Sequence, residues 1–218
     1  AVAQRTKFGR LIKLSRELAP AITLGFPQRK RGQSPANAFM SLNKEICTLE
    51  DDTLTVDYEQ LQCAQGSLTE PDITATYNTS TSKITFENTA MEDLAYCNAD
   101  DKTYGVLVNT QGGGCRVIPL GERGESGSTS VTLPAKWEKE HVIVYVFATS
   151  ANRIYTSGVL FLKFSVFPIG HGSSHSVKAS SPVVSSAHRA IRFFGKPPVA
   201  TRRAGGQWLS GTPCSPNN

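Results

Sequence analysis

The sequence lacks a long apolar run. None of its hydrophobic stretches reaches the roughly 18 residues that a membrane-crossing helix needs, so we predict no membrane span. The chain also begins without an initiator methionine and without the apolar core of a signal peptide. We therefore expect a fragment or a processed product.

Catalytic motifs are scarce as well. Between residues 34 and 165 the one histidine is His141, and no Gly-x-Ser-x-Gly elbow accompanies it. No Gly-Lys-Ser or Gly-Lys-Thr triplet forms a phosphate-binding loop, and His171 and His175 lack the glutamate of a zinc-binding helix. We predict a non-enzymatic protein with no catalytic residues, no cofactor and no metal site.

Cysteine is present, but never in the close pairs that a structural zinc site requires. The five cysteines are Cys47, Cys63, Cys97, Cys115 and Cys214, and their odd number leaves at least one free thiol. The favoured interpretation is small buried thiols in a reducing compartment. The alternative is a disulfide that joins Cys63 to Cys97 or Cys115.

Acidic residues are nearly absent from the two ends of the chain. Residues 1–33 hold eight lysines and arginines with one acid, and residues 166–218 hold six with none, whereas residues 34–165 hold nine basic and seventeen acidic residues. This segregation favours head-to-tail association between copies or contact with a polyanion, and two solvated basic ends are the alternative. The candidate polyanion contacts are Arg29, Lys30, Arg31, Arg189, Arg192, Arg202 and Arg203.

Helical patterns occur near the N-terminus. Residues 4–18 place apolar side chains at mostly helical spacing with basic residues on the other face, and Pro20 predicts an end near Leu18. Ser34 and Pro35 suit an N-cap and a first helical position, and the apolar stripe that follows predicts a second helix over residues 35–47. We expect the first helix to pack on its own domain, with binding to a membrane or to nucleic acid as the alternatives.

From Leu54 onwards, short β-branched and aromatic runs alternate with turn residues. The runs are 54–64, 72–77, 83–86, 104–109, 115–120, 128–133 and two arms within 141–167. Since no helical pattern separates them, they predict a mainly β protein: an antiparallel immunoglobulin- or fibronectin-like β-sandwich preceded by two helices. The predicted domains are an N-terminal helical segment (1–50), the β-sandwich (51–167) and an irregular basic tail rich in Ser, Pro and Gly (168–218).

The two arms within residues 141–167 form the densest apolar run, with a polar turn at 150–153 and a predicted final strand at 159–166. The first arm is apolar at both odd and even positions, so neither face suits water. Such a strand lies in a sheet covered on both sides or forms a subunit contact. The candidate assembly surface comprises Val142, Val144, Val146, Val159, Phe161 and Phe164.

Several segments resemble an uncharacterised protein family of Bacteroidota known as a domain of unknown function. They are QRTKFGRLIKLSRELAPAITLGF, SPANAFMSLNKEI, VDYEQLQCAQGSL, SGSTSVTLP and HVIVYVFATSANRIYTSGVLFL. The resemblance covers about residues 3–165 and is most specific at the Gln-Arg-x-Lys-Phe start and at Gln-Gly-Ser-Leu. It implies no catalytic residues. Family members usually carry a Gly- and Trp-rich stretch before that start, so we expect the true N-terminus to lie upstream.

The tail beyond Phe167 has no acid, little periodicity and scattered aromatic residues, so it is not expected to fold alone. It could wrap a neighbouring subunit, bind RNA or single-stranded DNA, or be an unselected extension.

Together these features predict a structural protein that associates with other copies of itself into a filament, surface layer or particle. We favour a cell-surface, extracellular or particle-associated location over the cytoplasm. One alternative is a nucleic-acid-associated module that uses the basic ends. Another is a carbohydrate-binding sandwich with Tyr77, Tyr96, Tyr104 and Trp137 as stacking residues.

Overall fold

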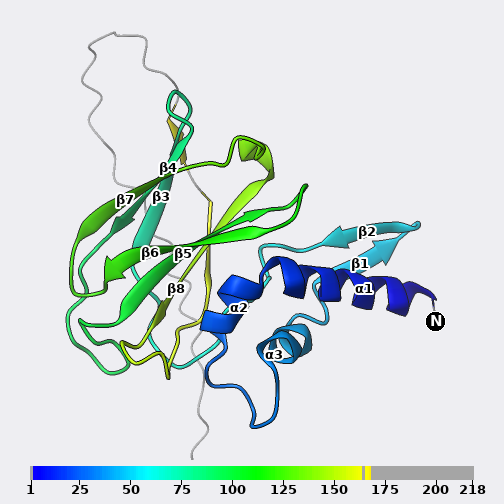
Figure 1. Cartoon of the computed structure of the whole chain (residues 1–218), viewed down its shortest axis with the longest axis horizontal. Coiled ribbons are helices and arrows are strands. Elements are labelled where there is room, and N and C mark those ends of the chain that lie inside the picture. The colour runs from blue at the N-terminus through cyan, green and yellow to red at the C-terminus, as the bar shows by residue number, and fades with distance from the viewer. Residues whose placement is uncertain (1, 164, 168–218) are drawn as a thin grey trace, which may run out of the picture. The chain divides into compact units, whose positions relative to one another are not determined.

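The computed structural model describes residues 2–163 and 165–167 (Figure 1). Its helices are α1 (Val2–Glu17), α2 (Ala19–Gly25), α3 (Pro35–Leu42) and a 3₁₀ turn, η1 (Lys139–His141). Its strands are β1 (Cys47–Glu50), β2 (Thr53–Val56), β3 (Ile73–Asn78), β4 (Lys83–Asn88), β5 (Lys102–Asn109), β6 (Cys115–Glu122), β7 (Gly127–Thr132), β8 (Val142–Thr149), β9 (Leu160–Leu162) and β10 (Ser165–Phe167). The prediction of a mainly β protein with N-terminal helices and antiparallel sheets is confirmed.

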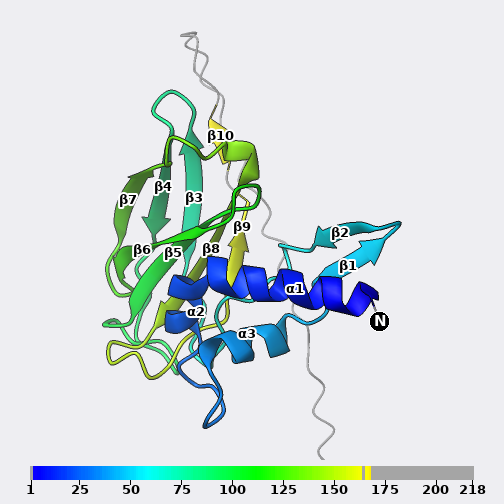
Figure 2. The same cartoon turned by 45° about the vertical axis from the view of Figure 1, so that its right-hand side comes forward.

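Two four-stranded sheets make up most of the structure, with strand orders β10-β3-β4-β7 and β6-β5-β8-β9. The longest ladder joins β5 to β8 from Lys102↔Thr149 to Asn109↔Val142. The two sheets share a core of buried residues, including Tyr77 and Phe86 from one sheet and Leu107 and Val144 from the other. They therefore pack face to face, as Figure 2 shows from the side.

The other face of β5 and β8 is covered by the helices. Leu14 of α1 and Phe39 of α3 lie in one buried cluster with Val106, Tyr145 and Phe147. Alternate residues of β8 thus enter two cores: Val144 faces the opposite sheet, and Tyr145 faces the helices. A strand buried on both faces reads as a continuous apolar run, which explains the unusual pattern of residues 142–149 without a second subunit.

The first helix ends close to its predicted position. Glu17 is the last residue of α1, and a new helix, α2, begins at Ala19 with Pro20 in its first turn, where a proline costs no hydrogen bond. The Ser34 hydroxyl accepts a hydrogen bond from the Asn37 amide at 3.1 Å, so the predicted cap of α3 is confirmed.

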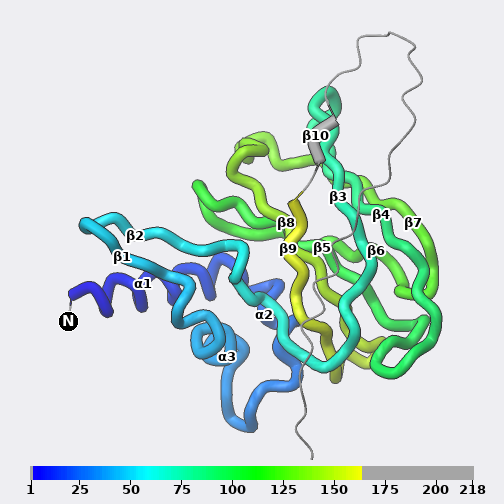
Figure 3. Tube along the Cα trace, turned by 180° about the vertical axis from the view of Figure 1, so that it is seen from behind, coloured from blue at the N-terminus to red at the C-terminus, as the bar shows by residue number. Residues whose placement is uncertain are grey.

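The second predicted helix, over residues 35–47, is too long, because α3 ends at Leu42. The buried Asn43 side chain donates from Nδ2 to the Phe39 and Gln62 carbonyls and accepts from the Gln62 amide. This short side chain satisfies the helix end and turns the backbone away. The chain then enters the hairpin β1–β2, which lies beside α1 (Figure 3). The sequence patterns predicted the second strand of this hairpin but not the first.

The predicted strand at residues 54–64 is correct only at its start. Strand β2 ends at Val56, and the Asp57 carboxylate accepts hydrogen bonds from the Glu59 and Gln60 amides to form a turn. The apolar residues beyond that turn, such as Leu61, are buried under the helices instead of joining a ladder.

The final strand predicted at residues 159–166 is divided between the two sheets. Strand β9 pairs with β8 over three positions, from Val144↔Leu162 to Val146↔Leu160. Strand β10 then runs parallel to β3 in the opposite sheet, where Ser165 pairs with Thr76. An alternating pattern is the same for one strand as for two consecutive ones, so it does not reveal the change of sheet.

Candidate functional site

The residues that the sequence patterns associated with catalysis or metal binding do not come together in the structure. The His141 ring is partly exposed at the start of β8, with Nε2 3.7 Å from the Glu138 carboxylate. Among residues 2–163 and 165–167, no group of three or more His, Cys, Asp or Glu side chains is placed to hold a metal ion. No helix in that part of the chain has the length and apolar character needed to cross a membrane.

The four cysteines in the described residues are free thiols, and three of them are buried. Burial raises the pKa of the Cys63 thiol to about 12, and it also raises the pKa values of Cys47 and Cys115. A thiol with a raised pKa forms little reactive thiolate near neutral pH. Cys47, Cys63 and Cys115 therefore act as small core residues, and Cys214 lies outside the described residues.

A basic loop, residues 27–33, connects α2 to α3. Arg29 holds this loop in shape, because its guanidinium donates to the Phe26 carbonyl at 2.9 Å and to the Gln33 carbonyl at 2.8 Å. The next two cations, Lys30 and Arg31, are exposed and have no ion pair with any described residue. The loop thus presents free positive charge on a fixed backbone.

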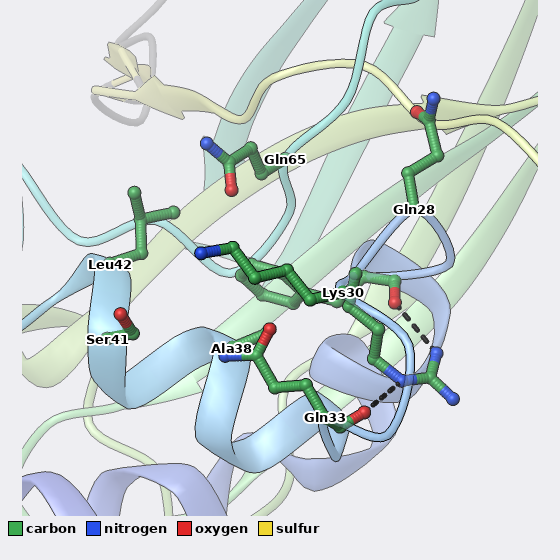
Figure 4. A pocket seen from close by; sticks show the side chains of 9 residues that line it. Gln28, Lys30, Gln33, Ala38, Ser41, Leu42 and Gln65 are labelled. Carbon is green, nitrogen blue, oxygen red and sulfur yellow. Dashed lines mark hydrogen bonds between the residues drawn. The ribbon is translucent and has the colours of Figure 1, made fainter.

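A pocket of about 310 Å³ lies between the basic loop and α3 (Figure 4). The side chain of Lys30 extends across it, and Gln33, Ser41 and Gln65 add amide and hydroxyl groups to its wall. Gln65 is placed by its backbone amide, which donates to the Gly25 carbonyl at 2.9 Å. The chemistry of the lining suits a small polar or anionic group.

A second candidate surface lies at the end of the sheets where residues 66–70 run between two loops. The Thr69 amide donates to the Tyr96 carbonyl at 2.8 Å, and the Leu68 amide donates to the Thr156 carbonyl at 2.9 Å. Residues 91–98 and 150–158 are thereby held on either side of this segment. Both loops carry exposed apolar side chains, among them Tyr96 and Tyr155.

A buried ion pair fixes the same end. Arg123, 0% exposed, and Asp101, 1% exposed, approach to 3.6 Å between Nη1 and Oδ2. Arg123 Nη2 donates to the Thr69 carbonyl at 2.6 Å, so the pair holds the segment that joins the two loops. Composition alone gave no sign of this contact, because Arg123 and Thr69 are 54 residues apart.

The candidate assembly surface is mostly interior. Val142, Val144, Val146 and Val159 are buried in the two cores, and Phe161 is partly buried beside Tyr145. The valines are therefore not available as a surface in the folded chain. Phe164 lies outside the described residues, as do Arg189, Arg192, Arg202 and Arg203.

The four candidate stacking residues do not form one platform. Tyr77 and Tyr104 are buried, and Trp137 packs partly buried against the core between the sheets. Tyr96 is exposed at the loop end. The sequence did not single out the residues that accompany it there.

The matched family covers most of the chain. A family model with the description "Family of unknown function (DUF6266)" matches residues 1–162. The chain belongs to this family. No curated protein and no solved structure matches the chain.

The DUF6266 region of this chain contains every element from α1 to β9, including the basic loop and both loops at the sheet end. The predicted resemblance to a family of unknown function is confirmed over that range. The Gln-Arg-x-Lys-Phe start forms the first turns of α1. The Gln-Gly-Ser-Leu segment, residues 65–68, connects the pocket to the loop end.

Proposed function

We propose that this DUF6266 protein is a non-enzymatic structural protein that associates with copies of itself, built on an immunoglobulin- or fibronectin-like sandwich. The observation that carries the proposal is the distribution of charge. Residues 2–50 hold nine lysines and arginines and three acids, whereas residues 51–167 hold eight and fifteen. The first part is therefore basic and the second acidic, by about equal amounts.

The charges of the basic part are available to a partner. Arg5, Arg16, Lys30 and Arg31 are exposed, and none of them has an ion pair with a described residue. Opposite charges on separate parts of one molecule attract when the basic part of one copy meets the acidic part of another. This arrangement supports a repeating head-to-tail contact.

Sedimentation velocity of the full chain tests the proposal. We expect species larger than the monomer at about 50 mM salt, and their dissociation at about 1 M, where the screening length falls to roughly 3 Å. The sedimentation coefficient should also rise with protein concentration. A monomer at low salt and at the highest soluble concentration would contradict self-association.

A second candidate function, binding of nucleic acid, rests on the basic loop. Lys30 and Arg31 offer two free cations beside a pocket lined with amide groups. We expect the double substitution Lys30→Glu and Arg31→Glu to weaken binding of labelled single-stranded DNA and RNA, and to reduce the dependence of affinity on salt. The matched control, Lys83→Glu and Lys136→Glu, makes the same change of charge at exposed positions on β4 and in the turn after β7, and it should have less effect. Equal losses in the two variants would exclude a role for the loop.

A further inference from the structure

Large apolar side chains are exposed at a few places on the described residues. They are Val2, Phe8, Leu42, Leu94, Tyr96, Ile154 and Tyr155. Four of them lie on the two loops at the sheet end, two lie on α1, and Leu42 lies on α3. This grouping differs from the single scattered residues that protein surfaces usually show.

The loop patch consists of Leu94, Tyr96, Ile154 and Tyr155. One extended segment separates its two halves, because Thr69 bonds to Tyr96 and the preceding residue bonds to Thr156. Adjacent extended segments lie about 4.8 Å apart, so the backbones of the two loops are about 10 Å apart. Side chains of this size span that distance, so the four residues lie within reach of one another.

The tip of this patch has a strained backbone that hydrogen bonds hold in place. Tyr96 has φ 64° and Arg153 has φ 58°, in the left-handed region that bulky residues rarely adopt. Leu94 and Cys97 exchange two backbone hydrogen bonds, at 2.9 and 3.0 Å, which close the turn around Tyr96. Strain of this kind persists where the surrounding structure imposes it, and it is concentrated at functional positions.

Acidic side chains border the loop patch. Glu92 and Asp93 immediately precede Leu94, and Glu70 is the last residue of the segment that joins the loops. All three residues are exposed, and the carboxylate of Glu70, which is partly buried, lies close to Gly158 on the second loop. The surface is thus an aromatic and aliphatic centre with a negative border.

The helix patch on α1 has the complementary composition. Val2, Arg5 and Phe8 follow one another at three-residue spacing, which places them on one side of the helix. Arg16 is exposed further along the same helix, and the buried residues Leu11 and Leu14 face the core. This surface combines exposed apolar groups with cations that lack partners.

We propose that the loop patch of one copy binds the helix patch of α1 on a second copy. The inference rests on the proposed function, self-association, and names its surfaces. The apolar side chains would cover one another at the centre, while Arg5 and Arg16 meet Glu70, Glu92 and Asp93 at the border. Since the two patches differ, the contact is heterologous. Each end of the resulting assembly therefore keeps one free patch, to which a further copy can bind.

Two full-length variants separate the patches. Phe8→Asp introduces a negative charge into the helix patch, and Tyr96→Asp introduces one into the loop patch at a backbone position that aspartate tolerates. Loss of a central aromatic contact should weaken association by about thirtyfold or more for each variant. Leu42→Asp is the control, because Leu42 is equally apolar, is exposed and lies outside both patches.

Mixing the two variants gives the decisive measurement. Each variant alone should be monomeric by sedimentation velocity. A mixture should form a dimer and nothing larger, because the intact loop patch of Phe8→Asp binds the intact helix patch of Tyr96→Asp and no other intact patch is left. Circular dichroism confirms that the variants are folded. A mixture that stays monomeric while each variant is folded would overturn the head-to-tail contact.

The outcome for the wild type distinguishes the two proposals. Wild-type protein that associates while both variants associate equally well refutes the patches and leaves self-association intact. Wild-type protein that remains monomeric refutes self-association, and the proposed contact with it. Loss of association in Leu42→Asp to the same extent would also refute the assignment of these two patches.

Discussion

Replacement of Arg123 by methionine should strongly destabilise the fold. The guanidinium is fully buried 3.6 Å from the Asp101 carboxylate, which is itself buried. Methionine keeps a long flexible side chain but removes the cation, so Asp101 is left as an uncompensated charge in the interior. Breaking a buried pair from one side costs about 3–5 kcal/mol. The variant also loses the bond from Arg123 to the Thr69 carbonyl.

Urea unfolding of the full chain, followed by circular dichroism, measures this cost. Lys102→Met is a matched control, since it removes a cation whose ion pair with Glu122 is partly exposed, and exposed pairs contribute far less to stability than buried ones. The double variant Arg123→Met with Asp101→Leu should recover most of the lost stability, because it removes both charges. If Arg123→Met costs no more than Lys102→Met, the buried pair does not stabilise the loop end.

Three further predictions concern local packing and ionisation. Gly66→Ala should destabilise the fold by about 1–3 kcal/mol in urea, because an added Cβ would lie 2.0 Å from the Thr156 carbonyl oxygen; unchanged stability would refute this close approach. Burial raises the pKa of Glu70, so the folded state binds its proton more tightly than the unfolded state, and the stability gained from that proton is lost as pH rises through the folded pKa. Glu70→Gln should therefore raise the melting temperature at pH 7 but not near pH 4, and an equal gain at both pH values would contradict this cause. Cys63 should resist a thiol reagent at pH 8 until the protein unfolds, whereas the partly exposed Cys115 should react earlier; equal rates would refute the raised pKa as the controlling factor.

The alternation of apolar residues predicted the strands that have one buried face. Ile73, Ala75 and Tyr77 point to the core between the sheets, and β3 extends only one residue past its predicted end. The helix start at Ser34 was equally clear, because a side-chain cap is a local feature. Local patterns therefore gave the elements that depend on nearby residues.

Contacts between distant residues were beyond such patterns. Whether β8 meets a second subunit or a layer of helices is decided by Leu14 and Phe39, which precede β8 by more than a hundred residues in the sequence. The end of α3 depends on hydrogen bonds between Asn43 and Gln62. The loop patch likewise arises because Leu68 and Thr69 bring together two loops that the sequence shows only as separate turns.

The shared core of the helices and β8 also bears on synthesis of the chain. Leu14 and Leu18 emerge from the ribosome early, but they are buried against Tyr145 and Phe147, which follow about 130 residues later. At about 5–20 residues per second, the apolar stripe of α1 stays uncovered for roughly 6–26 seconds. During that interval the apolar face of the nascent helices is exposed to solvent. A chaperone that binds amphipathic helices would therefore contact the chain before β8 displaces it.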